Sequence, residues 1–194
     1  PLYTPRELKH QLTDSQSKAL VILENFANTY EKIAKDVQLE KVITTQIGDL
    51  LPAPKRWLVN FVVKYVKRMV PSHSISQRID FNVALNKGKQ KAYQRPGLTG
   101  DDIAFLQYTG GTTGVAKGAM LSHRNMVANL EQVSSVITPI MSDGEEIIIT
   151  ALPLYHIFAL TANCLTFIKH GGRNILITNP RDMPGFVKEL GKVK

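Results

Sequence analysis

The sequence predicts an α/β fold, a layered parallel or mixed sheet whose strands are joined by crossover helices. Three observations support this prediction. Short apolar runs of strand length alternate along the chain with longer stretches of helical period. Several of these runs are rich in β-branched residues, which favour strands. The 194 residues are 43% hydrophobic, which is enough apolar material to bury one sizeable core.

The first fifty residues predict the opening unit of this fold. A capping box with proline at the first helical position predicts a short helix over residues 5–13. Apolar runs at 18–23 and 41–45 predict two strands, and the first of them is expected to be buried. Asn25 is expected to cap the helix between them. This helix–strand–helix–strand order predicts a parallel α/β unit over about residues 1–50.

A basic amphipathic helix is predicted over residues 55–70, after a break made by two prolines. Apolar residues cover one face of this helix, and the opposite face carries one basic stripe of Arg56, Asn60, Lys64, Lys67 and Arg68. A wide apolar face with a basic rim is typical of a helix that lies in a membrane surface. The alternative is an ordinary helix that docks on the core and leaves its charges in water. The candidate membrane-surface residues are Arg56, Trp57, Lys64, Lys67 and Arg68.

Residues 101–194 predict a second α/β unit, whereas residues 72–100 indicate little beyond a helical turn or two near 81–85. Either Ser122 or Asn125 can cap the first helix of this unit, and Asp182 can cap the last. In order, the expected elements are strands at 103–108 and 118–122, a helix ending before Pro139, a strand at 147–152, an apolar helix from Tyr155 through Ile168, a strand at 174–178 and a final helical segment.

One stretch, residues 108–118, concentrates four glycines, three threonines and one lysine. Glycine lets the backbone approach a ligand closely, and successive backbone N–H groups can form a concave site for anionic oxygens. The threonine hydroxyls and the Lys117 ammonium add further donors, so a polyphosphate would use all of these groups together. The spacing matches neither the Walker A pattern nor the dinucleotide pattern. The alternative is an exposed Gly/Thr hairpin without a ligand.

Composition narrows the function classes. The net charge of +8 suits anionic partners such as ATP, coenzyme A or an anionic lipid surface. No nucleic-acid recognition motif accompanies the charge, so we do not expect nucleic acid as a partner. The single Cys164 excludes an internal disulfide and suits a reducing compartment. No apolar stretch approaches the roughly 18 residues of a spanning helix, so we expect a cytoplasmic protein.

Two segments carry a specific resemblance. Residues 108–123, YTGGTTGVAKGAMLSH, resemble the signature phosphate-binding loop of adenylate-forming enzymes, which include acyl-CoA synthetases, luciferases and peptide-synthetase adenylation domains. Residues 152–158, LPLYHIF, resemble the next motif of that family at a fitting distance. The amino-acid sequences of both motifs are most similar to those of bacterial long-chain fatty-acid–CoA ligases. The resemblance extends over nearly the whole chain.

The resemblance implies an activity and a set of site residues. Such enzymes activate a fatty acid with ATP and Mg²⁺ to an acyl-adenylate and then transfer the acyl group to coenzyme A. Tyr155 and His156 would lie at the carboxylate and adenylate pocket, although a satisfied core histidine is the alternative for His156. We assign no catalytic residue within the fragment and do not expect His156 to act as a catalytic base, because a fatty carboxylate is already ionised at neutral pH. Thr113 is also a candidate for supporting Mg²⁺. The expected ATP- and pyrophosphate-binding residues are Thr109, Gly110, Gly111, Thr112, Thr113, Gly114 and Lys117.

The resemblance also implies that residues 1–194 are a fragment of a large N-terminal AMP-binding domain. The hinge, the C-terminal domain and the catalytic lysine of the family have no counterpart here, so we expect the fragment alone to be inactive. Peripheral contact with the inner face of the cytoplasmic membrane is a further expectation. Two alternatives remain. The parent could act on another carboxylic acid (medium-chain, aromatic or amino acid), or the chain could be a non-catalytic phosphate- or membrane-binding module.

Overall fold

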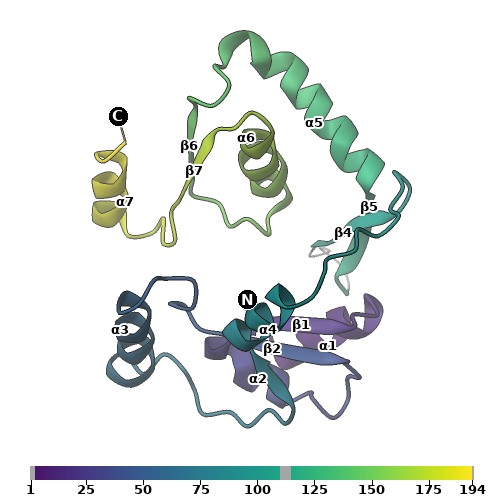
Figure 1. The fold of residues 1–194 in the computed structure, drawn as a ribbon, viewed down its shortest axis with the longest axis vertical. Coiled ribbons are helices and arrows are strands. Elements are labelled where there is room, and N and C mark those ends of the chain that lie inside the picture. The colour runs from purple at the N-terminus through teal and green to yellow at the C-terminus, as the bar shows by residue number, and fades with distance from the viewer. Residues whose placement is uncertain (1–2, 110–114, 194) are drawn as a thin grey trace. The chain divides into compact units, whose positions relative to one another are not determined.

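The computed structural model describes residues 3–109 and 115–193, and its helices and strands confirm the predicted α/β class (Figure 1). The chain divides into two compact units, Pro1–Pro96 and Gly97–Lys194. In the described residues the strands form three separate sheets, of which two are parallel and one is antiparallel. The mixed character of the sheets therefore agrees with the prediction.

The first unit begins with α1 (Pro5–Asp14), which starts where the capping box predicts. The backbone N–H of Glu7 donates to the hydroxyl of Thr4 (3.3 Å), and the Thr4 N–H donates to the Glu7 carboxylate (2.8 Å). These reciprocal bonds satisfy two of the helix-end donors that have no partner within the helix. The backbone and hydroxyl donors of Thr4 hold the pKa of the Glu7 carboxyl below its ordinary value.

A three-stranded parallel sheet follows, in the order β1 (Ala19–Leu23), β2 (Lys41–Thr45) and β3 (Arg78–Asp80). The crossover between β1 and β2 consists of η1 (Glu24–Phe26) and α2 (Ala27–Glu31), as the predicted helix–strand rhythm requires. The sequence did not indicate β3, which has three residues with charged ends. The buried core of this unit consists of Leu12, Tyr30, Ile33, Val37 and Val42.

Two details of this unit correct the predictions. β1 is not buried throughout, because Leu20 and Ile22 pack against the core whereas Val21, on the opposite face, is 57% exposed. Asn25 does not cap a helix. The chain passes directly from the extended Leu23 into η1, so Asn25 already lies inside the first helical turn, and its side-chain amide donates to the Met69 carbonyl (2.9 Å).

The basic helix is shorter than predicted and presents the opposite face to its unit. It consists of α3 (Lys55–Phe61) and the π-helical η2 (Val62–Val66), after which Arg68 takes a left-handed φ of 50°. The side chain of Asn60 accepts from the Gly48 N–H (2.7 Å) and donates to Asp49 (3.2 Å). A Cβ on Gly48 would lie 2.6 Å from the Asn60 oxygen, so this close approach requires glycine.

The apolar face of α3 and η2 is therefore exposed. Trp57 and Tyr65 are each 62% exposed, and Leu58 and Phe61 are also more than half exposed. Within the described residues the helix contacts its unit through Asn60 and Lys64 rather than through this apolar face. Amphipathic periodicity shows which residues share a face but does not show which face meets the neighbouring elements.

Glu24 is a buried carboxylate at the start of the β1–β2 crossover. It accepts hydrogen bonds from Gln46 Nε2 (2.8 Å) and Arg78 Nη1 (3.2 Å), and Lys64 Nζ lies 3.5 Å away. Burial alone would raise the pKa of Glu24, but the Gln46 bond and the charges of Lys64 and Arg78 together hold it below its ordinary value. After β3 the unit ends with α4 (Phe81–Lys89), which is longer than the predicted turn or two.

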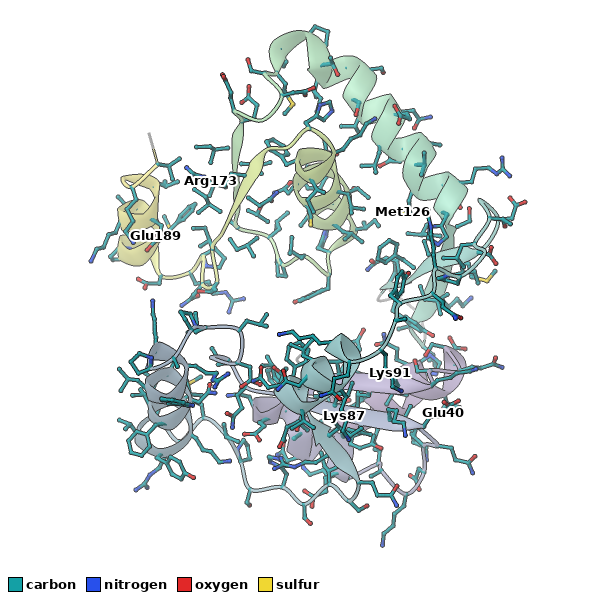
Figure 2. All side chains as sticks on the ribbon, viewed as in Figure 1. Glu40, Lys87, Lys91, Met126, Arg173 and Glu189 are labelled. Atoms are coloured by element: carbon teal, nitrogen blue, oxygen red, sulfur yellow. The ribbon has the colours of Figure 1, made fainter. Side chains whose placement is uncertain are left out.

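The second unit opens with an antiparallel hairpin of β4 (Ile103–Thr109) and β5 (Lys117–Ser122). The 15-residue α5 (His123–Ile137) follows, and Met126 lies on its buried side (Figure 2). Ser122 is the N-cap residue, and Asn125 is its partner in a reciprocal pair of hydrogen bonds. The two predicted cap candidates therefore act together.

A second parallel pair, β6 (Ile147–Thr150) with β7 (Arg173–Leu176), completes this unit. The crossover between the strands is helical, through the π-helical η4 (Ala159–Leu165) and α6 (Thr166–Lys169). The final α7 (Met183–Leu190) is capped by Asp182, which accepts from the Gly185 N–H (3.1 Å), as predicted. Both strands are shorter than the predicted ranges 147–152 and 174–178.

Polar side chains, most of them at least partly buried, form two hydrogen-bonded groups in this unit. Asn163 on η4 donates to the Thr150 hydroxyl (3.2 Å), which donates to Asn174 on β7 (2.8 Å). The His170 ring lies between the Ser134 hydroxyl (3.0 Å) and the Asp143 carboxylate (2.7 Å). Because buried polar groups need partners, the first group fixes η4 against β6 and β7, and the second joins α5 to the end of α6. No pattern in the sequence indicated either group.

Candidate functional site

Two of the predicted phosphate-binding residues, Thr109 and Lys117, face each other across the hairpin. Thr109 ends β4, Lys117 begins β5, and the two are paired directly. The segment between them is the glycine- and threonine-rich one. Its predicted site residues Gly110, Gly111, Thr112, Thr113 and Gly114 lie outside the described residues.

Strand alternation assigns these side chains to one face of the hairpin. Residues two apart on a strand share a face, and directly paired residues on antiparallel strands share that face too. Gln107, Thr109 and Lys117 therefore lie on one face, whereas Tyr108 lies on the other. The Tyr108 ring lies across its paired residue Gly118, where an added Cβ would come 3.0 Å from the ring. Glycine at 118 leaves the room that this ring occupies.

The second predicted motif lies beside the first. The side-chain amide of Gln107 donates to the main-chain carbonyl of Tyr155 at 3.2 Å, although the two residues are 48 positions apart. This contact is made by the hairpin face that also carries Thr109 and Lys117. The structure thus brings the hairpin of the phosphate motif and the Tyr155–His156 turn together.

Tyr155 and His156 lie in a turn between β6 and the following helix, which begins at Ile157 rather than at Tyr155. The His156 N–H donates to the Pro153 carbonyl (2.9 Å), and the His156 carbonyl accepts from the Leu160 N–H (2.9 Å). The ring atom Nδ1 accepts from the Phe158 N–H (3.3 Å), which puts the proton of a neutral ring on Nε2. Both side chains are exposed.

The predicted membrane-surface residues belong to the first unit. Arg56 and Trp57 lie on α3, where the Arg56 guanidinium is 5.8 Å from the Trp57 ring centre. Lys67 and Arg68 are exposed just after η2. Lys64 differs from them, because its ammonium lies against the buried Glu24 carboxylate.

Sequence reasoning missed Gln107. It lies within the apolar run IAFLQY, whose pattern predicts only a strand. A half-buried amide in an otherwise apolar strand needs a hydrogen-bond partner, and that requirement was the available signal.

The described residues hold neither a cluster of metal-ligating side chains nor a helix that could span a membrane. Within residues 3–109 and 115–193, no group of three or more His, Cys, Asp or Glu side chains is arranged to hold a metal ion. The candidate Thr113 lies outside these ranges. No helix in the part of the chain that the structure describes combines the length and apolar character needed to cross a membrane.

Comparison with known proteins gives a consistent family match. The family model described as AMP-binding enzyme matches residues 1–193. A long-chain-fatty-acid–CoA ligase of Escherichia coli O157:H7 is 60% identical over 192 residues, which cover 99% of this chain and 34% of that protein. The ligase of the same name from Haemophilus influenzae is 53% identical over 196 residues, covering 100% of this chain and 35% of its own length.

Solved structures show the same fold at low identity. Apo MatB from Rhodopseudomonas palustris matches with a TM-score of 0.62 at 23% identity, over 92% of this chain and 29% of that one. The anthranilate CoA ligase AuaEII, solved with anthranoyl-AMP, matches with a TM-score of 0.65 at 17% identity, over 91% of this chain and 29% of that one. The chain thus spans about a third of the length of the relatives it matches.

Proposed function

Because the chain belongs to the AMP-binding enzyme family, we propose that it forms part of the large N-terminal domain of an ATP-dependent long-chain fatty-acid–CoA ligase. The names of the two bacterial ligases described above support the substrate class. The observation that carries the site is the contact between Gln107 and Tyr155, which joins the hairpin of the phosphate motif to the second motif.

The phosphate side of the site would be built on the hairpin. In acyl-adenylate formation the fatty carboxylate attacks the α-phosphorus of ATP, and pyrophosphate leaves. The protein must hold the triphosphate and stabilise the charge that builds on the leaving group. We assign this role to Thr109 and Lys117, together with Gly110–Gly114 between them. Mg²⁺ would enter with ATP as part of the substrate, with Thr113 as a supporting hydroxyl.

The carboxylate side of the site would be the turn at Tyr155 and His156. Its exposed rings lie on a segment that contacts the hairpin face carrying Thr109 and Lys117. His156 would orient the carboxylate rather than remove a proton, since a fatty acid is already ionised at neutral pH. The thiol of coenzyme A would then attack the acyl carbonyl of the adenylate, which forms the thioester and releases AMP.

Because the chain covers about a third of its relatives, we propose that the rest of a complete ligase supplies the remaining functions. These are the adenine site, the hinge and the catalytic lysine. The chain alone is then expected to form no acyl-CoA. Within it we propose an α/β unit at about 1–50, a basic segment at 55–70 that contains the helix Lys55–Val66, and an α/β unit with the phosphate loop at 101–194.

We also propose peripheral contact with the inner face of the cytoplasmic membrane. The exposed apolar side chains of Trp57, Phe61 and Tyr65, with the exposed cations Lys67 and Arg68 nearby, support this proposal. A helix that shows aromatic and apolar side chains to solvent beside cations suits an anionic lipid surface.

Fatty-acid-dependent exchange between pyrophosphate and ATP in the complete ligase tests the main proposal. We expect exchange with long-chain fatty acids and thioester formation once coenzyme A is added. If exchange occurs only with an aromatic acid, a medium-chain acid or an amino acid, that acid would replace the long-chain fatty acid as the proposed substrate. The absence of exchange with every acid tested would favour a non-catalytic phosphate- or membrane-binding module.

A further inference from the structure

We propose that Gln107 is a positioning residue for adenylation, which sets the position of the Tyr155–His156 turn relative to the phosphate-binding hairpin. This inference rests on the function proposed above. Gln107 would touch neither ATP nor the fatty acid. Its effect would pass through the main chain of Tyr155.

The chemistry of the contact suits this role. The amide nitrogen of Gln107 donates to the main-chain carbonyl of Tyr155, so the bond fixes the backbone whatever side chain position 155 carries. That carbonyl belongs to the peptide unit that leads directly into His156. Gln107 lies two residues before Thr109 on the same strand face, so one strand segment carries both the contact and a phosphate-binding candidate.

The turn is also held on its other sides. At its start, Thr150 at the end of β6 is fixed by Asn163 and Asn174. At its end, the main chain of His156 bonds to Pro153 and Leu160. These contacts hold the turn to β6, β7 and its own helix, whereas the Gln107 bond ties it to the hairpin. Gln107 therefore controls the separation between the phosphate side and the carboxylate side.

That separation matters more for rate than for stability. An in-line attack needs the carboxylate oxygen and the α-phosphorus in contact at the correct angle, and a displacement of about 1 Å can cost roughly 100-fold in rate. The hairpin ladder and the polar groups around Thr150 remain when the Gln107 amide is removed. Loss of the amide should therefore leave the fold intact and slow adenylation.

The test uses the complete ligase with Gln107→Met, which keeps the side-chain length without the donor, and Gln107→Glu, which faces the carbonyl with a carboxylate. Gln132→Met, at an exposed position on α5, is the matched control. Two half-reactions are measured: fatty-acid-dependent pyrophosphate–ATP exchange, and thioester formation from supplied acyl-adenylate and coenzyme A. The unfolding temperature is measured for each variant.

We expect exchange to fall by about 10- to 100-fold in both Gln107 variants, with the larger loss for Gln107→Glu. Thioester formation from supplied adenylate and the unfolding temperature should stay near those of Gln132→Met. Exchange within about twofold of the unchanged enzyme, or an equal fall in both half-reactions, would overturn the inference. The unchanged enzyme serves as a separate test of the proposed function, since its failure to catalyse exchange would reject that function without involving Gln107.

Discussion

The ammonium of Lys64 lies 3.5 Å from the buried carboxylate of Glu24, so this lysine belongs to the interior side of its helix. The helical period of the sequence places Lys64 in one basic stripe with Lys67 and Arg68. The structure separates them, because Lys67 and Arg68 are exposed after η2. A charge change at Lys64 would therefore affect the fold as well as any membrane contact.

Reversing the exposed pair tests the membrane proposal. The double change Lys67→Glu with Arg68→Glu should reduce binding to vesicles that contain anionic lipid, because each cation near such a surface contributes about 1 kcal/mol. Co-sedimentation of the chain with vesicles measures this loss. The same charge change in Lys87→Glu with Lys89→Glu, at exposed positions on α4, is the control. Equal binding by both double variants would exclude a specific contact through the η2 end.

Glu24 should make the stability of the first unit pH-dependent. Its folded pKa is lower than its ordinary value, so its stabilising contribution is complete above roughly pH 4.3 and is lost as the pH falls through the folded pKa. Glu24→Gln should lower the free energy of unfolding at pH 7 by about 1–2 kcal/mol. It should also flatten the decline below roughly pH 4.3.

Urea unfolding of the chain at a series of pH values measures both effects. Glu145→Gln, at an exposed position before β6, is the control and should keep the acid-dependent decline. Parallel pH profiles for the Glu24→Gln variant and the unchanged chain would show that the buried carboxylate does not produce the dependence.

Gly118→Ala should destabilise the hairpin. The new Cβ would lie 3.0 Å from the Tyr108 ring, and overpacking of this kind typically costs about 1–3 kcal/mol. Gly88→Ala is the opposite case, because nothing lies within 4 Å of its added Cβ, and alanine favours α4 by about 0.5–1 kcal/mol. Urea unfolding should therefore give changes of opposite sign. A neutral Gly118→Ala would mean that the ring moves aside without loss.

Lys117→Ala should weaken pyrophosphate binding. Removing a cation that contacts a phosphate group costs about 1.5–3 kcal/mol, which corresponds to a loss of roughly 10-fold or more in affinity. Calorimetry with pyrophosphate and with ATP measures this loss. Lys188→Ala is the control, because it removes an exposed lysine from α7 and so changes the net charge by the same amount as Lys117→Ala. This variant should bind pyrophosphate as tightly as the unchanged chain does. Equal binding by the two variants would remove Lys117 from the proposed phosphate site.

The sequence predicted most elements because their signals are local. The Thr4 capping box, the Ser122 cap and the apolar runs of β1, β2 and β6 depend on neighbouring residues, and each element is present. The orientation of the helix at Lys55–Val66 depends instead on Asn60 meeting Gly48 and Asp49, residues that lie outside it. Such contacts become visible only when the chain is folded.

In the candidate site too, residues with a local sequence signal could be predicted, whereas a residue that depends on a distant partner could not. Thr109 and Lys117 could be singled out because glycine, threonine and lysine cluster in one short segment. Gln107 could not, because its role depends on a carbonyl 48 residues further along the chain. Periodicity identified its strand but not its partner.

The direct pairing of Thr109 with Lys117 has a consequence for chain entropy. The β4–β5 ladder holds the two ends of the intervening segment at a fixed separation before any ligand binds. Closing a free segment of that length would oppose anion binding, whereas a ladder already formed removes that cost in advance. Weaker strand pairing anywhere in this hairpin should thus lower phosphate affinity even where no ligand contact is lost.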